Sequence, residues 1–203
     1  MELNKAKEIM GKNFIGPEEL LKFSKKLGVV LPKKIPAVPF SADFLNRIKK
    51  NYILFLGLPV SINKMLRVFR TDPKKYEPCF YNQDWYLKEK FASKKLEFKW
   101  YLIKKEINQK SRGKNPADLE KKFNKKESFP SAVSVAFLFF AYYFYSNKII
   151  WEKDFIWCRD KDSNNDRIYV GRYKDPKKIN KNGFNIHRHL SIKNYYGSAP
   201  EIL

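Results

Sequence analysis

The fold is decided near the C-terminus by residues 157–171, which read WCRDKDSNNDRIYVG, and by residues 182–187, which read NGFNIH. Short runs of aromatic and β-branched residues alternate there with Asp, Asn, Ser and Gly, and this alternation indicates strands separated by turns. We therefore predict three short strands joined by polar turns. They should pair as a twisted antiparallel sheet within residues 149–190.

Helix signals dominate the first part of the chain, residues 1–75. Pro17 and two following acids open a helix that Gly28 ends. Ser41 and Ser61 are good N-caps for two further helices, over residues 42–50 and 62–69. Residues 52–57 form an apolar run and are predicted to be a buried strand. This part should therefore be mainly helical with one strand.

Residues 76–203 are predicted to mix helices and strands. We expect a helix over residues 84–91, a strand over 98–103 and a helix capped near Asn115. The longest helix follows Pro130 and is apolar on nearly every side, so it should be central. Helices first and paired strands last indicate an α+β fold, with the helices packed on the C-terminal sheet. The two parts should form one compact unit.

The chain can bury a core and carries a large positive charge. Its 203 residues are 43% hydrophobic and 16% aromatic, too much for a disordered chain. Lys and Arg total 42 against 21 Asp and Glu, a formal net charge of +21. Such a charge attracts nucleic acid and other polyanions. The alternative is that it serves solubility or reflects coding bias, since the cations are mostly Lys, a poor reader of bases.

A lysine-rich surface and the C-terminal loops are the expected contacts with a macromolecular, anionic partner. Lysine pairs recur beside aromatic residues such as Trp85, Tyr86, Trp100, Tyr101 and Tyr173, a combination that can bind a nucleic acid strand. Alternatively the aromatic residues are core and the lysines a solvated rim. The candidate contact residues are Lys94, Lys95, Lys104, Lys105, Arg112, Lys114, Arg159, Arg167, Arg172, Lys174, Lys177, Lys178 and Arg188.

One candidate metal site lies in the polar turn between the first two C-terminal strands. Asp160, Asp162, Asn164 and Asp166 have the alternate spacing of oxygen ligands that opens a calcium loop. The acid expected at the twelfth position is replaced by Gly171, and helices do not flank the loop. The alternative is a solvated turn whose side chains bond to nearby backbone.

The two histidines are a second candidate metal site. His187 and His189 would point to one face of a strand about 7 Å apart, which suits zinc with Cys158 or Asp160 as a third ligand. They could equally lie on a polar or core face. Calcium and zinc are thus the cofactors considered, and neither is required by the sequence.

Sequence signatures of catalysis are missing. The chain has no Gly-rich phosphate loop, nucleophile elbow or zinc-protease helix. Cys79 and Cys158 form no Cys-x-x-Cys pair; one disulfide between them is possible but not implied, and buried free thiols in a reducing cytoplasm are the simplest expectation. No secretory signal opens the sequence, and the apolar run 132–145 is shorter than the roughly 20 residues of a membrane span. We favour a non-enzymatic, cytoplasmic binding protein and leave a His-dependent metalloenzyme as a weaker alternative.

Several short motifs together resemble a known group of sequences. They are residues 100–107, 111–114 and 154–158, then Val170-Gly171 and residues 183–186. This pattern resembles a family of uncharacterised bacterial proteins whose ending is similar to the C-terminal sheet of C-type-lectin-like domains, including formylglycine-generating-enzyme-like and retroelement-diversified variable proteins. The resemblance implies a C-type-lectin-like fold for residues 76–203 and no particular activity. The chain departs from a diversified loop because Lys is as common as Asn near its end.

Overall fold

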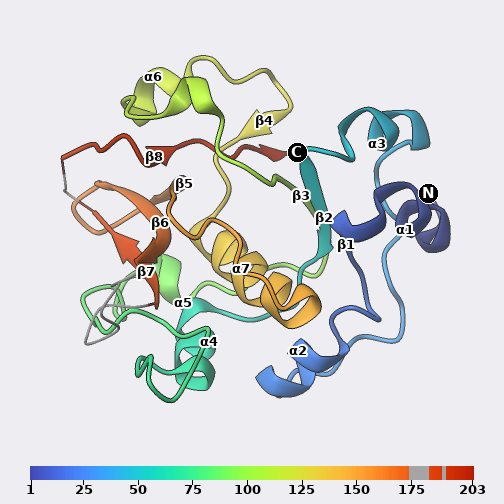
Figure 1. The fold of residues 1–203 in the computed structure, drawn as a ribbon, viewed down its shortest axis with the longest axis horizontal. Coiled ribbons are helices and arrows are strands. Elements are labelled where there is room, and N and C mark those ends of the chain that lie inside the picture. Colours follow the sequence, from blue (N-terminus) through green and yellow to red (C-terminus); the bar gives the residue numbers. More distant parts are fainter. Residues whose placement is uncertain (174–182, 189–190) are drawn as a thin grey trace.

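A computed structural model describes residues 1–173, 183–188 and 191–203 and confirms the α+β class (Figure 1). The described α-helices are α1 Leu3–Met10, α2 Leu21–Leu27, α3 Ala42–Ile48, α4 Ile62–Phe69, α5 Lys90–Ser93, α6 Pro116–Glu120 and α7 Ala132–Ser146, with short 3-10 helices η1 Gly11–Asn13 and η2 Gln109–Ser111. The described strands are β1 Phe14–Ile15, β2 Tyr52–Leu56, β3 Trp100–Lys104, β4 Glu127–Ser128, β5 Phe155–Lys161, β6 Arg167–Tyr173, β7 Gly183–His187, β8 Tyr196–Gly197 and β9 Glu201–Ile202.

Two sheets divide these strands. The predicted C-terminal sheet has the order β7-β6-β5-β8, and β5, β6 and β7 are antiparallel as expected. A second sheet, which the sequence did not predict, has the order β1-β2-β3-β9-β4. It joins strands from residues 1–75 to strands from residues 76–203, and one core cluster also contains residues of both parts. The two parts therefore share one sheet and one core.

Helix α7 lies between the two sheets, as Figure 1 shows. Phe137 stacks on Phe55 of β2 with ring centroids 5.9 Å apart, and Phe139 meets Phe184 of β7 at 5.0 Å. Residues 132–141 are all buried, which confirms the prediction of a central helix. The opposite face of the β2-β3 sheet carries α1 and α3 (Figure 1).

Local signals placed most helix ends correctly. The Oγ of Ser41 accepts a hydrogen bond from Phe44 N, and the Oγ of Ser61 accepts one from Lys64 N, so both residues cap as predicted. Gly28 ends α2 with φ 63°, in the left-handed region that glycine tolerates best. Helix α2 begins later than predicted, at Leu21, after a turn in which Gly16 N donates to Glu19 Oε2.

The predicted helix over residues 84–91 was wrong. Residues 85–88 form turns, and only α5 is helical in this region. Gln83 Nε2 and Trp85 Nε1 both donate to the carbonyl of Ile186 on β7, and the ring of Tyr86 is buried. These tertiary contacts hold the segment along β7, in place of the helix that its local sequence favours.

Both cysteines are buried and no disulfide joins them, in agreement with the prediction of free thiols. Burial raises the pKa of Cys79 to about 12 and raises that of Cys158 well above its usual value. No helix among the described residues is long and apolar enough to cross a bilayer.

Candidate functional site: a lysine pocket at the ends of two strands

Two of the four candidate calcium ligands, Asp160 and Asp162, bond to other groups of the protein. The carboxylate of Asp160 accepts a hydrogen bond from Ala132 N at 2.6 Å, at the start of α7. Asp162 accepts hydrogen bonds from the backbone of Asn164 and Asp166 and pairs with Arg188. Within the described part of the chain, no group of three or more His, Cys, Asp and Glu side chains could hold a metal ion. The loop therefore forms a turn in which the side chain of Asp162 bonds to nearby backbone, the second alternative considered for this segment.

His187 lies among aromatic rings. Its ring centroid is 5.9 Å from that of Phe155 and 5.7 Å from that of Tyr169. The amide Nδ2 of Asn185 lies 2.7 Å from His187 Nε2, and burial lowers the pKa of His187 below its ordinary value. His189 lies outside the described residues. Of the two predicted zinc ligands, the structure therefore describes only His187.

The five predicted contact arginines all form ion pairs that join separate parts of the chain. Arg112 binds both carboxylate oxygens of Asp154, at 2.7 and 3.1 Å. Arg172, only 7% exposed, binds Glu77 at 2.7 Å and Glu152 at 3.3 Å. The other pairs are Arg159 with Glu201, Arg167 with Glu120, and Arg188 with Asp162 and Glu89. Their charges are thus balanced within the fold.

The predicted contact lysines fall into three groups: exposed lysines, lysines outside the described residues, and lysines that line a pocket. Lys94, Lys95 and Lys114 are exposed, and Lys174, Lys177 and Lys178 lie outside the described residues. Lys104 and Lys105 line a hollow of about 370 Å³, which we call the lysine pocket. Its wall also contains Lys50, Asn51, Glu106, Ile107, Asn108, Gln109 and Lys110.

Strand register builds this pocket. Tyr52 at the start of β2 lies opposite Lys104 at the end of β3, so the residues beyond each strand end come together. Lys105 N donates to the carbonyl of Asn51 at 2.8 Å, and Trp151 Nε1 donates to the carbonyl of Lys105 at 2.8 Å. The backbone that carries the lysines is therefore fixed by hydrogen bonds on two sides.

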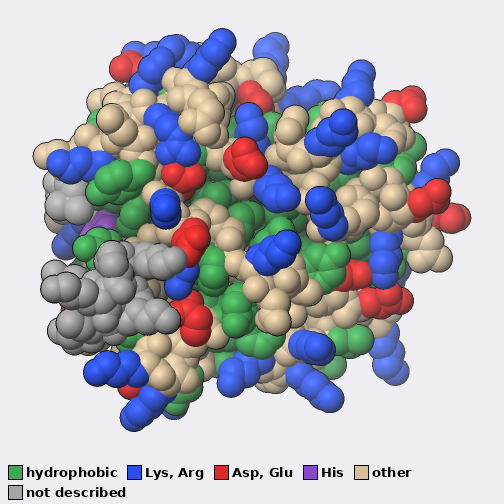
Figure 2. All heavy atoms as spheres, in the orientation of Figure 1, with side chains coloured by type: hydrophobic (Ala, Val, Ile, Leu, Met, Phe, Trp, Pro, Cys, Tyr) green, Lys and Arg blue, Asp and Glu red, His purple; other side chains and the backbone are tan. Residues whose placement is uncertain are grey.

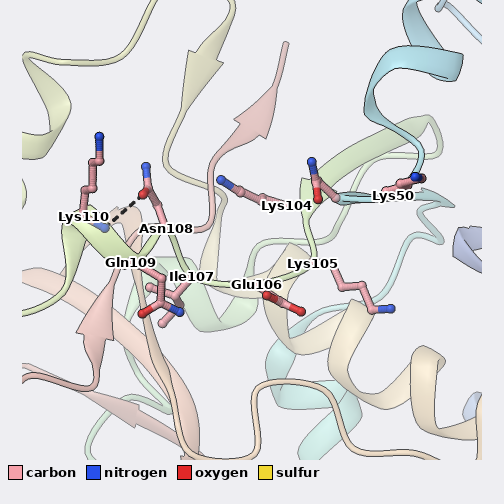
Figure 3. Close-up of a pocket in the computed structure, with 9 residues that line it drawn as sticks. Lys50, Lys104, Lys105, Glu106, Ile107, Asn108, Gln109 and Lys110 are labelled. Atoms are coloured by element: carbon pink, nitrogen blue, oxygen red, sulfur yellow. Dashed lines mark hydrogen bonds between the residues drawn. The ribbon is translucent and has the colours of Figure 1, made fainter.

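Figure 3 shows how the side chains lie. Lys104 extends toward Asn108 and Lys110, whereas Lys105 extends away from them. Asn108 caps η2 by accepting a hydrogen bond from Lys110 N at 3.1 Å. Four lysines and one acidic residue, Glu106, thus line this pocket, and the side chain of Lys105 extends away from the other two labelled lysines of the 104–110 segment. The excess of positive charge is suited to an anionic ligand.

Sequence reasoning missed Lys50, Asn108 and Lys110. Lys50 was assigned to the end of a helix, and nothing local connects it to residues 104–110, more than fifty positions later. The available signal was the pairing of the two apolar runs 52–57 and 98–103, which brings their lysine-flanked ends together.

Lys and Arg side chains also occupy much of the rim of the face drawn in Figure 2.

The aromatic residues predicted to stack on bases are mostly core. Tyr86, Trp100 and Tyr101 are buried, and Trp85 is covered by the guanidinium of Arg188, 4.3 Å from its ring centroid. Of these residues, only Tyr173 is substantially exposed.

Comparison with protein-family models, with curated protein sequences and with solved structures finds no match to this chain.

Proposed function

We propose that this protein binds a polyanion, with nucleic acid as the foremost candidate, and that the lysine pocket contacts the phosphates. The observation that carries the proposal is the contrast between the two kinds of cation. The predicted contact arginines are balanced by carboxylates, while the pocket is lined by four lysines and one acidic residue.

Lysine gives this binding a particular character. Its ammonium group is a point charge and lacks the planar fork with which Arg reads guanine or grips a phosphate through two bonds. Recognition is then of charge and not of sequence. The protein binds without chemistry at this site.

The C-terminal sheet belongs to the proposal as a scaffold. We assign residues 76–203 a C-type-lectin-like fold, supported by the antiparallel β5, β6 and β7 and by the polar turn after β5. Because Asp162 in that turn pairs with Arg188, we place the anion contacts at the lysine pocket and not at the turn.

Salt dependence tests the proposal quantitatively. Four phosphate contacts predict that log Kobs falls with log salt at a slope of about −3.6 on duplex DNA, or on the order of 100-fold between 50 and 200 mM salt. Fluorescence anisotropy with a labelled, mixed-sequence oligonucleotide measures this slope. Absence of binding at 50 mM salt would rule out the proposal.

A matched pair of variants locates the site. The pocket variant replaces Lys50, Lys104, Lys105 and Lys110 by Gln, and the control replaces four exposed lysines elsewhere, namely Lys22, Lys25, Lys33 and Lys34. Both variants lose the same net charge. The pocket variant should bind more weakly and reduce the salt slope toward zero, while the control keeps most of the slope. Equal losses in the two variants would show that diffuse charge alone attracts the ligand.

A further inference from the structure

A second hollow, of about 480 Å³, lies on the face of the β2-β3 sheet that α3 only partly covers. We call it the aromatic groove. Its apolar rings come from Phe40, Phe44 and Trp100, and its cations from Arg47 and Lys126, while Lys99 and Glu201 also line it. The rings and these two cations come from the residue before the cap of α3, from α3, from the start of β3 and from the residue before β4.

The groove is built from rings held in place. Phe40 and Phe44 are stacked with centroids 5.7 Å apart and an interplanar angle of 27°, and both are half-buried. Trp100 Nε1 donates to the carbonyl of Pro36 at 2.8 Å, which ties the start of β3 to the segment before α3. The half-buried rings of Phe40 and Phe44 therefore present apolar surface beside solvent, while the ring of Trp100 is buried.

Sheet register separates the groove from its one acidic lining residue. Leu102 pairs with Ile202, and Ile103 pairs with Glu201. Because side chains alternate along a strand, Trp100, Leu102 and Ile202 share one face, while Lys99 and Glu201 belong to the other, where Lys99 lies over the ring of Tyr101. On that other face Glu201 pairs with Arg159 at 3.4 Å.

The cations at the groove rim are largely unbalanced. Arg47 follows Phe44 by three positions on α3, so the two side chains lie on neighbouring parts of one helix face. Neither Arg47 nor Lys126 forms an ion pair with a described residue, and Lys99 pairs with Glu97 at 2.7 Å. The groove therefore suits a ligand that combines a flat apolar ring with negative charge.

We propose that the aromatic groove stacks an unpaired base of a single-stranded nucleic acid, and that the protein consequently prefers single strands to duplexes. This inference rests on the nucleic-acid binding proposed above. Bases in a duplex are stacked on one another, whereas bases of a single strand are free to stack on protein rings.

The two sites are arranged for one ligand. Trp100 and Lys104 are the first and last residues of β3, and four steps at about 3.3 Å per residue separate them by about 13 Å. A strand whose base enters the groove can therefore place phosphates a few nucleotides away at the lysine pocket.

The test compares a labelled 12-nucleotide mixed-sequence RNA with a duplex of the same length, by anisotropy at one salt concentration. The double variant Phe40→Leu/Phe44→Leu should bind the single strand at least about 5-fold more weakly, the lower end expected for loss of base stacking. Its affinity for the duplex should change less than 2-fold. Phe44→Tyr, which keeps an aromatic ring, should retain single-strand binding.

Two controls keep the test interpretable. Tyr145→Leu removes an exposed ring at the end of α7 and should leave both affinities unchanged, and circular dichroism melting shows whether each variant folds. Should the double variant fail to fold, Arg47→Gln provides the second route, with a selective loss of single-strand affinity expected.

The outcomes separate the two proposals. If native protein binds both RNAs equally, or if the leucine variant weakens both alike, the inference is wrong and the polyanion proposal stands. If neither RNA binds, the polyanion proposal is wrong. If only vesicles rich in phosphatidylglycerol bind and the leucine variant abolishes that binding, the groove contacts lipid and the inference is also wrong.

Discussion

Replacing Asp160 should destabilise the protein through the central helix, and not through loss of a metal. Asp160 lies on β5, and its carboxylate accepts a hydrogen bond from Ala132 N, the first residue of α7, at 2.6 Å. The N-terminus of a helix carries partial positive charge and unpaired N–H groups, so a carboxylate there stabilises the helix. Ser131 supplies a separate cap to Ser134 N at 3.1 Å.

The size of the effect follows from what Asp160→Ala removes. A buried N–H left without its partner costs about 1–3 kcal/mol, and loss of a helix cap typically costs about 1 kcal/mol. Burial raises the pKa of Asp160, so removing the charge also relieves a desolvation cost. We therefore expect a net loss of about 1–2 kcal/mol. In a chain of this length that lowers the melting temperature by roughly 2–8 °C.

Asp160→Asn separates the hydrogen bond from the charge. The amide oxygen can still accept from Ala132 N, so the loss at neutral pH should be below about 1 kcal/mol. Because the folded-state pKa of Asp160 is raised, its stabilising contribution is full below the unfolded value near 3.9 and declines as pH rises through the folded value. The Asn variant cannot ionise, so its stability relative to native protein should increase from about pH 4 to pH 7.

Thermal melting followed by circular dichroism, with and without millimolar calcium, measures these effects. Asp84→Ala, which removes an exposed loop carboxylate, is the matched control and should shift the midpoint by less than about 1 °C. A melting midpoint of Asp160→Ala equal to that of the Asp84→Ala control would refute the proposed role of Asp160. It is refuted equally if calcium stabilises native protein and fails to stabilise Asp160→Ala, since Asp160 would then be a ligand.

Two further predictions concern buried titratable groups. Cys79 and Cys158 should react with a thiol reagent only in denaturant, because burial raises the pKa of Cys79 to about 12 and that of Cys158 well above normal; fast labelling of folded protein would contradict this. Burial lowers the pKa of His187, so the unfolded chain takes up its proton first, and stability should fall as pH drops below about 6.5. In His187→Gln the loss of stability between pH 7 and pH 5 should be smaller than in native protein. Identical melting curves for variant and native protein over this range would exclude the effect.

Elements with complete local signals were predictable from sequence. Ser61 and the apolar pattern after it define α4 within its observed bounds, and residues 52–57 match β2 within one position. The length of apolar sequence after Pro130 likewise identifies α7. In each case the residues that stop and start the element are its own neighbours in the chain, so no distant contact is needed to place it.

Elements that depend on a distant partner were not predictable. Strands β1 and β9 have two residues each, too few to show a period, and β9 exists because the chain end inserts between β3 and β4. Residues 84–91 have a helical pattern, yet hydrogen bonds to Ile186, about a hundred positions later, hold them otherwise.

The amino-acid sequence alone determined the α+β class, the central apolar helix, the three C-terminal strands and the excess of positive charge. Only the tertiary structure decided where that charge is available. Arg112 meets Asp154 and Arg172 meets Glu77 across 42 and 95 positions, while Lys50 and Lys104 are gathered by strand register beside few acids. The physical reason is that opposite charges form an ion pair only when they come within a few ångströms of each other, and spacing along the chain does not reveal which of them will come that close.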